Sequence, residues 1–259
     1  AEEVARLAGI APERVVVVPL GGPAPSPPPA PGDAAEAMEV LGRFGVVPGR
    51  YILHVGVLER RKNLGMLARA FARWRSPADG GSMRDAATDS TGAESKSDFK
   101  LVLVGQPGPR PDLDDSGALR QLIAELGLES SVVLTGHVTS VERDAFYAHA
   151  AAVAIPSTFE GFGLPVLEAF AARAPVVAAR ATALPEVAGD AALLFDPANP
   201  AELATCLARV TSDTALGASL VERGLARVAQ FTWERTAAET LRVFERAADP
   251  TAARAGPHT

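Results

Sequence analysis

Pro156 to Phe170 reads PSTFEGFGLPVLEAF, and this stretch decides the fold. A short apolar run, Ala151 to Ile155, precedes it and a helical apolar pattern ends it, which predicts a strand, a loop and then a helix. The loop glycines, Gly161 and Gly163, permit positive φ angles or a close approach of a ligand to the backbone. Pro165 suits the first helical turn, where backbone N–H groups have no acceptor within the helix. The helix start is therefore a candidate site for an anion such as phosphate.

Two carboxylates flank this helix start: Glu160 in the loop and, eight positions on, Glu168, which we expect in the first turn of the helix. A carboxylate beside a phosphate would repel it, so both glutamates are expected to accept hydrogen bonds from neutral hydroxyl groups, as on sugars. This combination indicates a sugar nucleotide. The competing interpretation is two solvated acids on a surface helix that follows a glycine turn, because short motifs often match by chance.

The string EGFGLPVLEAFA, which begins at Glu160, resembles the E-x7-E signature of the retaining glycosyltransferases of family 4 (group 1), which have the GT-B fold. The resemblance implies that Glu160 is the catalytic residue and faces the donor sugar, and that Glu168 holds the ribose. It also implies contacts from the intervening residues, with Gly161 and Phe162 at the sugar and Gly163 and Leu164 at the diphosphate.

The composition is that of an ordinary globular protein. With 259 residues, 47% of them hydrophobic, the chain can bury a sizeable core in one or two domains. A formal net charge of −6 argues against a general nucleic-acid binder. The single cysteine, Cys206, excludes an intramolecular disulfide and lies in an apolar helical pattern that favours a buried, inert thiol. No apolar run reaches the roughly 18 residues of a membrane span.

A basic loop follows the expected strand Tyr51 to Val57 and contains Arg60, Arg61 and Lys62. Adjacent cations at the end of a strand can neutralise a diphosphate, although a solvated basic turn would look the same. In the family that the chain resembles, this loop supplies a lysine and an arginine to the donor diphosphate. Lys62 matches the lysine. The arginine usually follows the glycine of the strand, where this chain has Val57, so Arg61 or Arg60 would have to serve.

Two further strand ends carry nucleoside-binding candidates. The expected strands Lys100 to Gly105 and Ser131 to Leu134 run into glycine turns, which by resemblance place Gly105, His137 and Val138 near the nucleoside. Ordinary loops remain an alternative. A catalytic role for His137 is not favoured, because the family varies this side chain. His54 lies inside a strand and is expected in the core.

Alternating strands and helices from Tyr51 to Phe195 predict an α/β fold with a doubly wound parallel, Rossmann-like sheet, the C-terminal half of a GT-B enzyme by resemblance. The expected domain organisation is a remnant of an N-terminal acceptor domain at 1–20, with a strand from Arg14 to Pro19, a Pro/Gly-rich linker at 21–49, and a nucleotide-sugar-binding domain at 50–248. Within that domain, 76–98 is expected to be a disordered insertion, and 249–259 a frayed tail.

By resemblance, the chain carries the donor-binding part of an enzyme that transfers a sugar from a nucleoside-diphosphate sugar with retention of configuration, as in polysaccharide biosynthesis. The resemblance implies no metal or other cofactor, and a sugar or lipid-linked acceptor bound by the N-terminal domain. The isolated fragment is expected to be inactive. We expect a cytoplasmic protein, at most peripheral at the inner membrane face, with no nucleic-acid partner. A non-catalytic sugar-nucleotide-binding subunit and another GT-B enzyme, such as a UDP-sugar 2-epimerase, remain alternatives.

Overall fold

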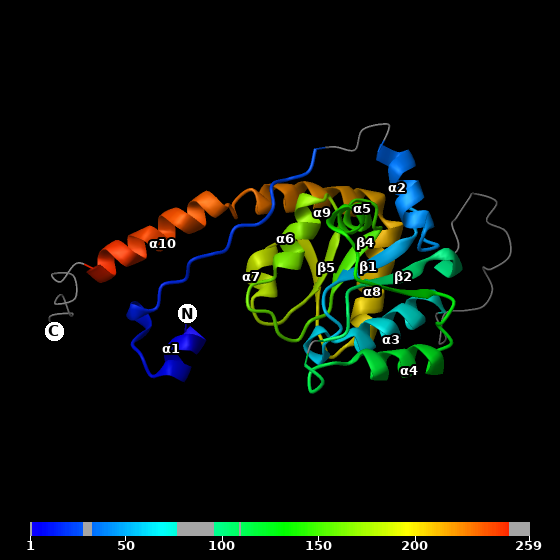
Figure 1. Ribbon diagram of the computed structural model, residues 1–259, viewed down its shortest axis with the longest axis horizontal. Coiled ribbons are helices and arrows are strands. Elements are labelled where there is room, and N and C mark those ends of the chain that lie inside the picture. The colour runs from blue at the N-terminus through cyan, green and yellow to red at the C-terminus, as the bar shows by residue number, and fades with distance from the viewer. Residues whose placement is uncertain (1, 28–32, 77–95, 109, 249–259) are drawn as a thin grey trace.

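The computed structural model describes residues 2–27, 33–76, 96–108 and 110–248 (Figure 1). Its centre is a six-stranded, all-parallel sheet with the strand order β3-β2-β1-β4-β5-β6. The strands are short and rich in Val, Leu, Ile and Ala, as expected of parallel strands covered on both faces. Their bounds are β1 Tyr51–Val55, β2 Lys100–Val104, β3 Val132–Gly136, β4 Ala152–Ile155, β5 Val176–Ala179 and β6 Ala192–Phe195.

Helices cover both faces of the sheet. On one face α3 packs against α4 and α8, and on the other α5 packs against α2 and α6, with α9 on α6 (Figure 1). Right-handed crossovers place the connecting helices α3 and α4 on one face and α5 and α6 on the other. The reason is that the chain moves in one direction across the sheet from β1 through β2 to β3, and in the opposite direction from β3 through β4 to β5. The helix bounds are α1 Glu2–Ala8, α2 Asp33–Gly42, α3 Leu64–Arg75, α4 Ser116–Glu125, α5 Ser140–Ala148, α6 Leu164–Ala171, α7 Leu184–Ala188, α8 Pro200–Ser212, α9 Thr214–Val228 and α10 Trp233–Ala248.

This strand order confirms the doubly wound, Rossmann-like fold. The chain reverses its direction across the sheet between β1 and β4, which are neighbours. In such sheets ligands bind at the carboxyl ends of the two strands that flank the reversal. The loops that follow these two strands are the basic loop and the Glu160 loop.

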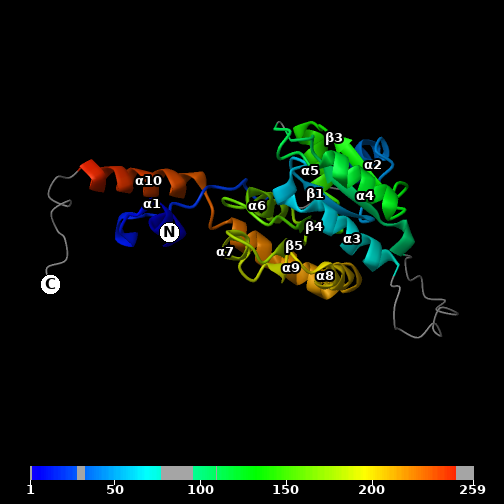
Figure 2. The same cartoon turned by 90° about the horizontal axis from the view of Figure 1, so that it is seen from below.

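The segment Arg14 to Pro19 does not form the expected strand. Pro12–Arg14 is a 3-10 turn, and the residues after it are extended but unpaired among the described strands, with Val16 and Val17 46% and 54% exposed. The segment instead meets the start of α10, where the Thr236 hydroxyl donates to the Pro19 carbonyl at 2.7 Å. A β-branched run needs a partner strand to become a strand, and the described sheet offers none here. Figure 2 shows α10 projecting away from the sheet.

The expected linker at 21–49 is only partly extended. Asp33–Gly42 forms α2, whose Leu41 is fully buried, and the following Phe44 packs edge-on against Phe146 of α5 at 5.2 Å between ring centroids. The Ala-rich composition of this part hid apolar residues at helical spacing. The proposed insertion at 76–98 falls mostly on 77–95, and the proposed tail on 249–259, both outside the described residues; Lys96–Asp98 forms a 3-10 turn.

The C-terminal helices follow β6, and the single thiol among them is buried, as expected. Thr232 precedes α10, and its side chain accepts a hydrogen bond from the Arg235 N–H, as a helix N-cap does. Cys206 is buried on α8, and burial raises the pKa of its thiol. Among the described helices, none is both long and apolar enough to cross a membrane.

Candidate functional site

The loop after β1 is shaped so that its cations face the loop after β4. Arg60–Lys62 forms a 3-10 turn, which Asn63 ends in the left-handed conformation at φ 55°. The Asn63 side chain donates to the Pro156 carbonyl at 3.3 Å and to the Pro197 carbonyl at 2.9 Å. The Thr158 N–H donates to the Arg61 carbonyl at 2.8 Å. The bonds to Pro156 and from Thr158 join two loops that are almost 100 residues apart in the sequence, and the bond to Pro197 adds the loop after β6.

Glu160 lies at the centre of the joined loops and is only 8% exposed. Its Oε1 accepts hydrogen bonds from Lys62 Nζ at 2.6 Å and from the Ser157 hydroxyl at 2.7 Å, and its Oε2 accepts from Arg61 at 3.2 Å. Its backbone N–H donates to the Thr182 hydroxyl, after β5, at 3.0 Å. The carboxylate is therefore held by groups that follow β1 and β4, and the Glu160 backbone is held by a group that follows β5.

The electrostatics of this cluster favour an ionised Glu160. Burial alone raises the pKa of the carboxyl group, but the hydrogen bonds from Lys62 and Ser157, together with the charges of Lys62 and Arg61, outweigh it and lower the pKa below its usual value. Lys62 is 5% exposed, so each charge compensates the other in a region with little water. We refer to Arg61, Lys62, Ser157 and Glu160 as the Glu160 cluster.

The structure distinguishes the two candidate arginines. Arg61 reaches Glu160 and is also held by Glu59, which accepts from Arg61 Nε at 2.8 Å. Arg60 is exposed. Arg61 is thus the arginine placed beside Lys62. Reasoning from the sequence did not single out Glu59, Ser157 or Thr182, because nothing in their local spacing indicates what they contact.

Gly163 and Gly161 of the site differ in their structural surroundings. Gly163 has φ 105° and precedes α6 as its N-cap, and Leu164 beside it is 38% exposed. At Gly161 a Cβ atom would meet nothing within 4 Å, so this position opens onto free space. Phe162 points elsewhere, and its ring packs edge-on against Phe231 at 5.8 Å between centroids.

Gly105 has a structural role of its own at the end of β2. Its φ is 153°, and a Cβ atom there would lie 1.9 Å from the carbonyl oxygen of Gly56. Its N–H donates to the Gly136 carbonyl at 3.1 Å. The ends of β1, β2 and β3 therefore approach one another through backbone atoms at three glycines.

Glu168 belongs to a different set of contacts from Glu160. It is the fifth residue of α6, in the second turn rather than the expected first turn. It accepts a hydrogen bond from the Tyr147 hydroxyl of α5 at 2.8 Å, and both residues line a cavity of about 270 Å³ between α5, α6 and the segment Pro23 to Ser26. The two glutamates of the motif therefore face separate surroundings.

The two histidines considered above differ in burial. His137 is exposed just after β3, next to the half-buried Val138. His54 is buried in β1, as expected, and its Nδ1 lies 3.0 Å from the Ala154 carbonyl, which makes Nδ1 the protonated nitrogen. Burial lowers the pKa of His54 to about 4, so its ring is neutral at pH 7.

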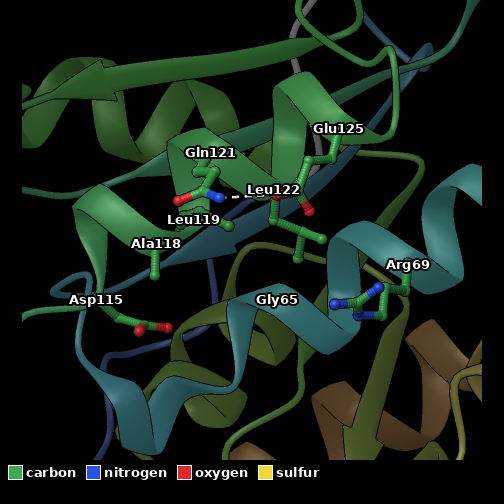
Figure 3. Close-up of a pocket in the computed structure, with 8 residues that line it drawn as sticks. All are labelled: Gly65, Arg69, Asp115, Ala118, Leu119, Gln121, Leu122 and Glu125. Carbon is green, nitrogen blue, oxygen red and sulfur yellow. Dashed lines mark hydrogen bonds between the residues drawn. The ribbon is translucent and has the colours of Figure 1, made fainter.

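The described residues also line hollows outside the Glu160 cluster. One of about 300 Å³ lies between α3 and α4, where the Gln121 side chain donates to Glu125 on one wall and Arg69 projects from the other (Figure 3). The second, of about 490 Å³, borders Gly161 and Phe162 and extends to the start of α10. Among the described residues, no group of three or more His, Cys, Asp or Glu side chains could hold a metal ion.

Comparison with known proteins places this site in context. The family described as "Glycosyl transferases group 1" matches residues 49–213. O-antigen chain mannosyltransferase B of Escherichia coli is 29% identical over 243 residues, which cover 94% of this chain and 57% of that protein. The chain thus spans about half the length of the curated relatives it matches.

Solved structures show the same fold. Sucrose-phosphate synthase from Thermosynechococcus elongatus superposes with a TM-score of 0.71 at 24% identity, over 95% of this chain and 56% of that one. HepE of Anabaena, in complex with UDP and glucose, superposes with a TM-score of 0.65 at 25% identity, over 83% of this chain and 53% of that one.

Proposed function

Since the chain belongs to the group 1 glycosyltransferases, we propose that it binds a nucleoside-diphosphate sugar and carries the donor side of a sugar transfer that retains the anomeric configuration, as in family 4. The observation that carries this proposal is the 2.6 Å contact between Lys62 and Glu160. It joins a cation suited to a diphosphate and a carboxylate suited to a sugar at the reversal point of the sheet.

The diphosphate would bind at Arg61 and Lys62 and at the start of α6. A guanidinium group chelates two phosphate oxygens, an ammonium group acts as a point charge, and the first N–H groups of a helix attract anions. Gly163 and Leu164 form this helix start, and Leu164 is partly exposed. These positive groups can stabilise the charge that develops on the leaving diphosphate, so the proposed reaction needs no metal ion.

The sugar would lie against Glu160, where the open space at Gly161 admits it. A carboxylate kept ionised by Lys62 can orient the sugar hydroxyl groups and stabilise positive charge at the anomeric carbon. Phe162 would contribute through its backbone, since its ring packs on Phe231. The nucleoside would extend toward Glu168, with Gly105, His137 and Val138 near the base.

Two of the similar proteins support the donor chemistry. One relative is a mannosyltransferase, and HepE was solved with UDP and glucose. We infer a nucleoside-diphosphate hexose as the donor class. Because the chain spans about half the length of its relatives, we assign acceptor binding to sequence beyond these 259 residues.

A panel of nucleoside diphosphates, screened by thermal unfolding of the 259-residue chain, tests the proposal. A diphosphate at 100 times its Kd adds about 2.7 kcal/mol to the free energy of unfolding, which is easily measured. We expect one nucleoside diphosphate to stabilise the protein more than its nucleoside does. If no member of the panel shifts the unfolding midpoint, donor binding by this chain is refuted. The anomeric configuration of the product formed by the complete protein, followed by NMR, tests retention.

A further inference from the structure

Tyr147 is a buried polar residue that has no role in the function proposed above. It lies on α5 and is 2% exposed, and its hydroxyl group donates to Glu168 Oε2 at 2.8 Å. The ring packs into the main core, while the hydroxyl group reaches the cavity of about 270 Å³ between α5 and α6. The hydroxyl group is the only polar atom of the Tyr147 side chain, and it is directed at the carboxylate that we expect to bind the ligand. Tyr147 can therefore control the position of the Glu168 carboxylate.

The hydrogen bond restricts a side chain that would otherwise be mobile. Glu168 is partly exposed on α6, and a glutamate loses considerable rotamer freedom when it is fixed. A donor on Oε2 leaves Oε1 with its lone pairs for a ligand hydroxyl. Burial, and then the charge of Glu168, raise the pKa of Tyr147 well above its usual value, so the phenol stays protonated and remains a donor.

We propose that Tyr147 is a positioning residue that holds Glu168 so that its free oxygen accepts hydrogen bonds from the ribose hydroxyl groups of the donor. This inference rests on the proposed function. Tyr147 does not touch the substrate but acts through Glu168. The competing explanation is that Glu168 merely satisfies a buried phenol, in which case the bond serves stability alone.

The chain contains a matched control for this distinction. The hydroxyl group of Tyr51, in β1, is also buried and donates to the Phe146 carbonyl at 2.6 Å. Tyr147→Phe and Tyr51→Phe each remove one buried hydroxyl group and keep the ring. Both variants lose comparable stability if the bonds are only structural, but only Tyr147→Phe removes a hydroxyl group that contacts Glu168.

The readout is the ratio of affinities for the best nucleoside diphosphate of the panel and for its 2′,3′-dideoxy counterpart, measured by calorimetry. Wild type and Tyr51→Phe should prefer the ribose form by about tenfold, as expected for a hydrogen bond to a charged group. Tyr147→Phe should reduce this preference about threefold or more. Affinity for inorganic pyrophosphate should be the same in all three proteins.

A double-mutant cycle tests whether Tyr147 acts through Glu168. Glu168→Gln should remove most of the ribose preference, and the double variant should lose no more than Glu168→Gln alone. Additive losses, an unchanged ratio in Tyr147→Phe, or equal changes in Tyr51→Phe would overturn the assignment of Tyr147. If Tyr147→Phe does not fold, Glu168→Gln still decides, because an unchanged ribose preference there also overturns the assignment. Failure of wild type to bind any diphosphate would instead overturn the proposed function, and this inference with it.

Discussion

The Glu160→Gln substitution should strengthen the binding of a bare nucleoside diphosphate, although Glu160 is proposed to face the sugar. In the structure Glu160 is the anion that neutralises Lys62 and Arg61. A diphosphate that binds these cations must compete with the carboxylate or lie beside it, and the two anions repel each other. The amide of glutamine retains an acceptor for Lys62 but removes the negative charge.

The expected magnitude follows from the burial of the pair. Removing one partner of a buried ion pair costs about 3–5 kcal/mol. Glutamine can still accept a hydrogen bond from Lys62, and the Arg61 side chain is 40% exposed and can turn to water. We therefore expect Glu160→Gln to lower the free energy of unfolding of the unbound protein by the lower end of this range, about 3 kcal/mol. The bound diphosphate restores an anion to Lys62. Recovering one charge-assisted hydrogen bond, about 1.5 kcal/mol, makes the affinity about tenfold higher than in wild type.

Calorimetric titration of the best diphosphate into three proteins checks this prediction. Glu239→Gln is the matched control, because it removes the same charge from an exposed pair with Arg235 on α10. We expect wild type and Glu239→Gln to bind alike and Glu160→Gln to bind more tightly, although it unfolds at a lower temperature. In the complete protein the kcat of Glu160→Gln should fall, since the carboxylate no longer stabilises charge at the anomeric carbon. Unchanged or weaker diphosphate binding would refute this account of the Glu160 cluster.

Three further outcomes are expected. Lys62→Ala should weaken diphosphate binding by about 1.5–3 kcal/mol and leave nucleoside binding unchanged, whereas Arg60→Ala, at an exposed position, should leave both affinities unchanged. Equal losses for both ligands in calorimetry would remove Lys62 from the diphosphate site. Gly105→Ala should lower the free energy of unfolding by more than about 2 kcal/mol, because its Cβ would clash with a backbone carbonyl at 1.9 Å, while Gly117→Ala in α4 should be neutral or stabilising by up to about 1 kcal/mol; similar denaturant midpoints would contradict this. Burial lowers the pKa of His54 to about 4 in the folded protein, against 6.5 in the unfolded chain, so the unfolded chain takes up the proton first as the pH falls. The free energy of unfolding should therefore drop by roughly 3 kcal/mol between pH 6.5 and pH 4. In urea titrations His54→Asn should flatten this part of the plot of unfolding free energy against pH, and an unaltered plot would show that another group causes the drop.

Much of the fold could be predicted from the sequence, because it is encoded in local patterns. Short apolar runs, alternating with helical apolar periods, predict a parallel, doubly wound sheet, and the structure confirms it. The motif around Glu160 and the basic residues before Asn63 indicated two candidate loops, and the structure brings these loops together. A periodic pattern acts over a few residues, and so it can be recognised without knowledge of distant partners.

Local patterns failed where a distant partner decides the outcome. The run before Pro19 has the composition of a strand but has no strand beside it in the described sheet. The sequence did not predict α2, whose apolar face packs on α5 in the structure. Likewise Lys62 meets Glu160 across 98 positions, and Tyr147 meets Glu168 across 21. The order of strands in the sheet creates these contacts, and that order depends on how the helices pack on both faces. The sequence by itself therefore determined the fold class and the candidate residues of the site, while the tertiary structure decided which of these residues contact one another.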